Sequence, residues 1–204
     1  GVATLNVEIL GDIIQGYLHV SSTIYNEEDV ISQTMFCAEN LAFFLKDLSE
    51  EIEHINIYFS VGNHGRTNAN YREHLDVENF EYIVLWFLKS RLSKINNIKF
   101  KKNIIDGEII CYKVFDKTIC AIHGHKDRID NVKKNLSDMV GELVDEVHMG
   151  HYHSFISKDD VVVNGALSGV DRYAISKRYN SEPTQVLKVY STNNDEVIYK
   201  INVR

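Results

Sequence analysis

Two histidines stand two residues apart, directly behind a glycine, in Gly150-His151-Tyr152-His153. Imidazole is the commonest protein ligand for metal ions near neutral pH, and a neighbouring glycine lets the backbone approach a bound group closely. The run 143–147 before them predicts a short strand. Alternate side chains of an extended segment point the same way, so both rings would face one point. The alternative is a pair of surface histidines at a strand end.

Three other stretches have the same form, an apolar strand followed by glycine with an acidic, amide or imidazole side chain. They are Gly11-Asp12, Gly62-Asn63-His64 and His123-Gly124-His125. Their donors are oxygen and nitrogen atoms without cysteine sulfur, which favours Mn²⁺, Fe²⁺, Zn²⁺ or Ni²⁺ over a soft structural zinc site. Loops at the carboxyl ends of strands gather at one place in open α/β sheets, so we expect these loops to converge.

The chemistry of such a site follows from its donor types. The carboxylate of Asp12 can bridge two cations, and a mixed set of this kind fits two metal ions about 3.5–4 Å apart. Two such ions activate a water molecule, orient a phosphate group and stabilise charge on the attacking and leaving oxygens. His64, beside Asn63, can protonate the leaving oxygen or stabilise the transition state. The sequence therefore predicts metal-assisted hydrolysis of a phosphate ester.

The bulk composition indicates one domain over residues 1–204. The formal net charge of −7 disfavours broad contact with a nucleic-acid backbone. The three cysteines are odd in number and lie in apolar runs, which indicates reduced, buried thiols in a cytoplasmic protein. No apolar run reaches the roughly 18–20 residues of a membrane span, and no signal peptide opens the chain, so we expect no membrane contact.

The order of expected elements is of the α/β class with extra antiparallel pairing. We expect strands and helices in the order strand 5–10, helix from 26, strand 55–61, helix 79–93, strand 118–122, helix 127–140 and strand 143–147, followed by hairpins that turn at 159–160 and 193–195. Asp106-Gly107 predicts a further hairpin turn.

The first helix has clear sequence signals. Asn26 can cap it, with acidic residues 27–29 in its first turn. An apolar stripe at helical spacing is expected to face the core. Its members are Ile31, Met35, Ala38, Ala42 and Leu45.

The four loops together resemble the second to fifth motifs of the calcineurin-like metallophosphoesterases, in the same order and over about residues 5–170. The strings 11–19 and 62–66 are most similar to phage and bacterial exonuclease-like members, which are related to the double-strand-break repair nucleases. The resemblance implies a two-sheet β-sandwich flanked by helices.

The resemblance also implies a role for each motif residue. Asp12 would bridge two divalent metal ions, manganese in the nuclease-like members, with iron, zinc or nickel as alternatives. One ion would be completed by Asn63, His123 and His151, and the other would be served by His153. His64 would be the catalytic histidine.

Two departures from the family pattern bear on activity. The family begins with an Asp-x-His motif on an earlier strand, and no such motif stands ahead of Asp12. We therefore expect the first strand to be missing: the chain is a fragment, a degenerate member, or one completed by a homodimer mate or another polypeptide. The usual acidic residue after Gly-Asn-His is replaced by Gly65-Arg66. Arg66 can grip a phosphate in a fork, or it is a solvated loop arginine.

Two other histidines are candidates for contact with substrate. His125 can contact phosphate or support a ligand, the alternative being a polar residue at the start of a helix. His19, in the loop after Asp12, can face the cleft.

The function expected is a metal-dependent phosphoesterase that cleaves phosphodiesters, DNA being one candidate substrate. The sequence has no stripe of basic residues interleaved with aromatic residues of the kind that binds nucleic-acid bases. A phosphomonoesterase or nucleotide phosphatase, a degenerate scaffold that binds a partner, and an interaction protein with accidental motifs are the alternatives.

Overall fold

The computed structural model describes residues 2–18, 24, 26–70, 77–103, 105–170, 174–175, 178, 180, 182–193 and 195–203. Strands and helices alternate along the chain, which confirms the α/β class. The chain divides into two compact units, residues 1–110 and 111–204, called here the first and second units. Among the described residues, no helix has the length and apolar character needed to cross a membrane.

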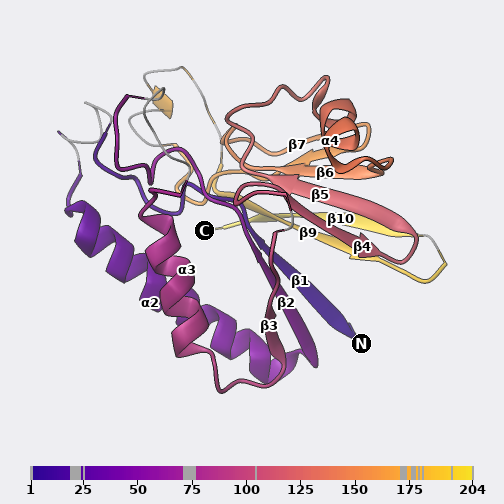
Figure 1. Cartoon of the computed structure of the whole chain (residues 1–204), viewed down its shortest axis with the longest axis horizontal. Coiled ribbons are helices and arrows are strands. Elements are labelled where there is room, and N and C mark those ends of the chain that lie inside the picture. Colours follow the sequence, from indigo (N-terminus) through magenta and orange to yellow (C-terminus); the bar gives the residue numbers. More distant parts are fainter. Residues whose placement is uncertain are drawn as a thin grey trace. The chain divides into compact units, whose positions relative to one another are not determined.

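The first unit contains a parallel sheet with helices in its connections. Its strands are β1 (Thr4–Ile9), β2 (His54–Phe59) and β3 (Ile98–Phe100), in the order β1-β2-β3. The connections contain α2 (Val30–Glu51) and α3 (Glu81–Arg91), which Figure 1 shows on the same side of this sheet. Parallel neighbours need crossover connections of this kind. The core of this unit includes Leu45, Ile57, Val84 and Leu88.

Helix α2 begins later than the sequence predicts. Its N-cap is Asp29, whose Oδ1 accepts from the amides of Ile31 and Ser32 at 2.8 and 3.0 Å. The prediction that Asn26 caps the helix is wrong, because its Nδ2 donates to the Gly16 carbonyl at 2.7 Å instead. A carboxylate that reaches two free amides of the first turn is a strong helix start.

The predicted apolar stripe of α2 is only partly buried. Ala38, Ala42 and Leu45 lie in the core, but Ile31 and Met35 are 53% and 65% exposed. The buried row continues from Ala38 back to Thr34, because four residues separate successive members of one helix face. The expectation for Ile31 and Met35 is therefore wrong.

The second unit contains a five-stranded mixed sheet in the order β4-β5-β6-β8-β7. Its strands are β4 (Ile110–Val114), β5 (Lys117–Ile122), β6 (Glu146–Met149), β7 (Ile156–Lys158) and β8 (Val161–Val163). Strands β5, β6 and β8 run parallel, and α4 (Val132–Val140) lies in the connection from β5 to β6. The hairpins β7–β8 and β9 (Thr184–Tyr190)–β10 (Glu196–Asn202) confirm the two predicted turns. Figure 1 shows these strands and α4.

Three other expectations for this part of the chain are corrected. Asp106-Gly107 is not a hairpin turn, because β3 and β4 belong to different sheets. The Asp106 carboxylate instead closes a local turn by accepting from the amides of Glu108 and Ile109, at 2.7 and 2.8 Å. Helix α4 begins five residues later than predicted, at Val132, and β6 begins three residues later than predicted, at Glu146.

The cysteines also differ from the expectation of reduced thiols. Cys111 and Cys120 form a disulfide between the neighbouring strands β4 and β5, with their Cα atoms 4.4 Å apart. Facing residues of paired strands approach this closely, so the sheet itself brings the two sulfurs together. Cys37 on α2 is free, and burial, with a smaller contribution from the Glu81 carboxylate, raises the pKa of its thiol to about 12.

Charged side chains are buried in the second unit where the β9–β10 hairpin meets β6. The carboxylate of Glu146 accepts from His148 Nε2 at 2.8 Å and pairs with the ammonium of Lys188. Lys188 also lies 2.7 Å from Glu196, and only 9% of its side chain is exposed. Buried charges are tolerated when they are paired and hydrogen-bonded in this way. The network therefore fixes the hairpin to the sheet.

Acid is expected to weaken this network through Glu146. Burial raises the pKa of this carboxyl, but hydrogen bonds from His148 and Lys188 more than offset that effect and hold the pKa at about 2, below the usual 4.5. Because the pKa of Glu146 is lower in the folded protein than in the unfolded chain, its ionised carboxylate stabilises the fold above pH 4.5. This contribution is lost as pH falls toward 2. We expect the free energy of unfolding to fall by about 3 kcal/mol over this window.

Urea denaturation of the wild type and Glu146→Gln at several pH values measures this contribution. The difference in unfolding free energy between the two proteins should shrink as pH falls from 4.5 toward 2. Glu50→Gln, at a side chain that is 66% exposed, is the matched control and should leave the pH profile unchanged. A constant difference between wild type and Glu146→Gln would contradict the assignment.

Candidate metal centre

Each motif loop directly follows a strand, as the sequence predicts. Asp12 follows β1, and Asn63 and His64 follow β2 in the first unit; His123 follows β5, and His151 follows β6 in the second. Strands β1 and β2 are parallel neighbours, and so are β5 and β6. Because parallel neighbours end at the same edge of a sheet, each unit brings one pair of motif loops together.

The two loops of the first unit meet backbone to backbone at two glycines. Gly11 has φ +79°, and a Cβ atom there would lie 2.3 Å from the amide nitrogen of Gly62. A Cβ atom on Gly62 would lie 2.1 Å from the amide nitrogen of Asp12. No side chain fits either position, so glycine is required at both. This contact explains why glycine stands before Asp12 and before Asn63.

Asp12 and His64 are held together in this unit. The amide of His64 donates to Asp12 Oδ1 at 2.9 Å, and His64 Nε2 lies 3.8 Å from Asp12 Oδ2. His64 Nδ1 lies 3.0 Å from the carbonyl oxygen of Gln15. A carbonyl oxygen can only accept, so this hydrogen bond places a hydrogen on Nδ1 of His64.

A buried carboxylate that the sequence does not single out supports both loops. Glu81 is fully buried in the first turn of α3. Its Oε1 accepts from the amide of Ile13 at 2.9 Å and its Oε2 from the amide of Gly62 at 2.7 Å. Asn79 adds to this arrangement: its Nδ2 donates to the Gly62 carbonyl at 2.8 Å, and its Oδ1 accepts from the Glu81 amide at 2.9 Å. Glu81 is therefore a positioning residue for the segments that carry Asp12 and Asn63.

Arg66 is buried rather than solvated. Only 8% of the residue is exposed, its Nε donates to the carbonyl of Asn68 at 3.4 Å, and its backbone forms an isolated antiparallel bridge with Asn79. The alternative of a solvated loop arginine is therefore wrong. At Gly65, a Cβ atom would lie 2.1 Å from Asn79 Oδ1, so the close approach of Asn79 requires glycine there.

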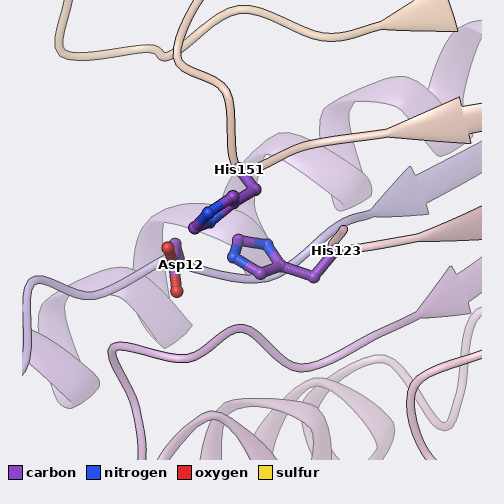
Figure 2. Close-up of side chains that lie close together, drawn as sticks. All are labelled: Asp12, His123 and His151. Atoms are coloured by element: carbon purple, nitrogen blue, oxygen red, sulfur yellow. The ribbon is translucent and has the colours of Figure 1, made fainter. Parts of the chain in front are cut away.

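The second unit gathers imidazole rings. His123 is 2% exposed, and its ring centroid lies 5.1 Å from that of His151 and 5.4 Å from that of His125. One ligand nitrogen of His123 lies within 4.8 Å of one of His151. Figure 2 shows these two rings beside each other, each on the loop that follows its strand. The centroids of His125 and His151 are 6.2 Å apart, so three rings form a cluster.

Backbone contacts hold the two loops of this cluster. The amide of Gly150 donates to the carbonyl of His123 at 3.0 Å. Gly124 has φ +101°, a conformation that L side chains rarely adopt, so glycine is favoured there. The hydroxyl of Tyr152 donates to the carbonyl of Asp127 at 2.7 Å, which anchors the residue between the two motif histidines.

His151 and His153 do not lie on an extended segment. Both have left-handed backbone conformations, with φ of 59° and 58°, so the expectation that a straight strand aims both rings at one point is wrong. The carbonyl of His153 accepts from the amide of Ala166 at 3.4 Å. Among the described residues, a ligand nitrogen of His123 lies within 4.8 Å of one of His151, and His153 is not part of this group. Asn63 is half-buried between Gly62 and His64, and His19 lies outside the described residues.

The spacing in the second unit fits two ligands of one ion. Metal–imidazole bonds of about 2.0–2.1 Å place two nitrogen ligands at most about 4.2 Å apart. The ligand nitrogens of His123 and His151 lie within 4.8 Å of each other, which is close to that range. The carboxylate of Asp12 in the first unit is a hard oxygen donor that suits the same divalent ions.

The comparisons with known proteins leave the family open. No family model and no curated protein matches the chain. Among solved structures, the chain is similar to the Thermotoga maritima protein TM1076, solved by solution NMR, with a TM-score of 0.45 and 11% sequence identity. The similarity covers 97% of this chain and 98% of that chain. A similarity of this size implies nothing about function.

Proposed function

We propose that the chain is a metal-dependent phosphoesterase of the calcineurin-like type that cleaves phosphodiesters, DNA being one candidate substrate. The observation that supports this proposal is the pairing of motif loops at strand ends. Asp12 is held against His64 in the first unit, and His123 lies beside His151 in the second. The close backbone contact of Gly11 with Gly62 holds the loops of Asp12 and His64 together.

In this proposal the metal ligands are those that the resemblance implies: Asp12 for both ions, Asn63, His123 and His151 for one ion and His153 for the other. The set of one carboxylate, one amide and three imidazoles suits two divalent cations, with manganese as the expected metal. When bound, such ions supply an activated water molecule and stabilise charge on the phosphate oxygens. Arg66, His125 and His19 stay candidates for contact with substrate.

The residues of the chain position the carboxylate and move a proton. The His64 amide fixes one oxygen of the Asp12 carboxylate, which orients the whole group. The Gln15 carbonyl fixes the His64 ring through Nδ1, so that Nε2 is the atom that donates a proton to the leaving oxygen. Glu81 keeps the segments that carry Asp12 and Asn63 in register.

The proposed role of His64 is tested by His64→Ala. We expect kcat to fall about 10²- to 10⁴-fold, because a positioned general acid contributes that much. The affinity for Mn²⁺ should stay the same, since His64 is not among the proposed ligands. We measure kcat in the presence of Mn²⁺ for a diester, bis(4-nitrophenyl) phosphate, and for a monoester, 4-nitrophenyl phosphate.

The matched control is His54→Ala, at an exposed histidine that begins β2. A wild-type kcat in His64→Ala would refute the role of His64. Faster turnover of the monoester would identify a phosphomonoesterase instead. A wild-type protein that cleaves neither substrate with manganese, iron, zinc or nickel would overturn the proposed function.

A further inference from the structure

The residues that directly follow β5, β6 and β8 in the second unit stand in one row across the sheet. They are His123, Gly150 and Asn164. The last residues of the three strands are paired in register. The pairing continues one step further, because the amide of Gly150 donates to the carbonyl of Ile122 at 3.3 Å and the amide of Asn164 to that of Met149 at 2.7 Å. Asn164 therefore belongs to the same row of strand ends as His123.

The row places an amide side chain and an imidazole on the same face of the sheet. In-register residues of parallel strands project from one face, so His123 and Asn164 flank Gly150, which has no side chain. Strands lie about 4.8 Å apart, which separates the two outer Cα atoms by about 10 Å. The ring of His151, which follows Gly150, lies beside that of His123 (Figure 2). The loop after β6 thus has an imidazole on the β5 side and Asn164 on the β8 side.

The side-chain amide of Asn164 has a fixed orientation. Nε2 of Gln185 donates to the carbonyls of Thr184 and Gly165, at 2.7 and 3.1 Å. The other atom of the Gln185 amide, Oε1, can only accept, and it lies 2.9 Å from Nδ2 of Asn164. Nδ2 is therefore the donor in this contact. Because the two polar atoms of an amide lie on opposite sides of one planar group, Oδ1 of Asn164 is directed away from Gln185.

Oδ1 of Asn164 is a buried acceptor. It is shielded from solvent, and no hydrogen bond from the described residues reaches it. A buried carbonyl oxygen without a donor costs about 1–3 kcal/mol, and each such atom in a folded protein calls for an explanation. An amide oxygen can only accept, so the oxygens of a phosphate ester are excluded as its partner. The group that satisfies it is an N–H, an O–H or a cation.

The segment of Asn164 also contacts the loop of the motif histidines through its backbone. The amide of Ala166, two residues after Asn164, donates to the carbonyl of His153 at 3.4 Å. With the bond from the Asn164 amide to Met149, this contact fixes the segment to the end of β6 and to the loop that follows it. The buried oxygen is therefore held beside residues 150–153.

From these contacts we infer that Asn164 is a positioning residue of the proposed metal centre, whose Oδ1 accepts a hydrogen bond from the imidazole of His151. An imidazole that holds a metal ion through one nitrogen almost always donates the hydrogen of its other nitrogen to an oxygen acceptor, which fixes the ring. His151 is the motif histidine that follows the neighbour of Asn164 in the row. The inference rests on the proposed function, because it takes His151 as a metal ligand.

Nuclear magnetic resonance of the metal-free full chain tests this hydrogen bond without reference to activity. A buried, hydrogen-bonded ring N–H exchanges slowly with water, so His151 should give an observable signal, assigned by its loss in His151→Ala. Asn164→Ala should remove the signal. Asn164→Asp keeps an accepting oxygen but loses the donor to Gln185, and it should retain the signal. A wild type without the signal, or an unchanged signal in Asn164→Ala, overturns the hydrogen bond.

Titration calorimetry with Mn²⁺ tests the consequence for metal binding. Asn164→Ala should bind Mn²⁺ about 10- to 100-fold more weakly than the wild type, the range for residues that orient a metal ligand. Asn164→Asp should stay close to the wild-type affinity. The matched control is Asn103→Ala, at another half-buried asparagine, whose Nδ2 donates to the carbonyls of Phe59 and Gly107. This control should leave the affinity unchanged, and circular dichroism checks that each variant folds.

The outcomes separate this inference from the proposed function. A wild type that binds none of manganese, iron, zinc and nickel overturns the proposed function, and the resonance of His151 then decides the hydrogen bond by itself. A wild type that binds Mn²⁺ while Asn164→Ala binds it equally well overturns the role of Asn164 alone. Equal losses of affinity in Asn164→Ala and Asn164→Asp also overturn it, because the contact with Gln185 would then be the one that matters.

Discussion

Replacing Glu81 with alanine is expected to lower the free energy of unfolding by about 3–5 kcal/mol. The Glu81 carboxylate accepts from two peptide amides, those of Ile13 and Gly62. A buried amide left without an acceptor costs about 1–3 kcal/mol, and the cavity left by the side chain adds to the loss. The effect should be large because Glu81 is fully buried, so water cannot take the place of its carboxylate.

Urea denaturation of Glu81→Ala and Glu81→Gln measures this contribution. The amide of glutamine has the shape of the carboxylate but only one accepting oxygen, so we expect Glu81→Gln to lose about half as much stability. Glu78→Gln, at a nearby exposed residue, is the control and should stay within about 0.5 kcal/mol of wild type. A loss below about 1 kcal/mol for Glu81→Ala would show that the two segments are held by other contacts.

Replacing Asp12 with asparagine is expected to remove most of the phosphoesterase activity while the fold persists. In the wild type, the amide of His64 donates to Asp12 Oδ1 at 2.9 Å. The side-chain oxygen of asparagine can still accept this hydrogen bond. The negative charge that would hold two cations is lost, however. Because bound metal ions supply several kcal/mol of charge stabilisation in this chemistry, turnover should fall about 10³-fold or more.

Titration calorimetry of metal-free protein with Mn²⁺ shows whether the ions are lost with the charge. Wild type should bind with measurable heat and Asp12→Asn should bind much more weakly or not at all. Asp116→Asn, at an exposed turn residue, is the control and should leave binding and turnover unchanged. Wild-type turnover of the diester by Asp12→Asn would refute the proposed metal-binding group.

Patterns of short range predicted the elements of the fold well. The strands expected at 5–10, 55–61 and 118–122 correspond to β1, β2 and β5, with bounds that differ by one or two residues. The position of the motif residues after these strands followed directly. The start of α2 was misplaced by a few residues, because Asn26 and Asp29 are both good caps and only the folded structure shows that Asn26 contacts Gly16 instead.

Interactions between distant residues were not predictable in the same way. Glu81 has the sequence signal of an ordinary first-turn glutamate, and nothing local shows that it is buried. The disulfide between Cys111 and Cys120 depends on the pairing of β4 with β5, which an odd number of cysteines obscured. The left-handed conformations of His151 and His153 depend on the loop that follows β6. The resemblance to the metallophosphoesterases stays a prediction.

The two hydrogen bonds of Glu81 also determine how the first unit can open. Residues 13 and 62 are far apart in the sequence, but the backbone amides of both donate to one carboxylate at the start of α3. A displacement of the first turn of this helix therefore acts on both segments at once, so their local opening is coupled through one side chain.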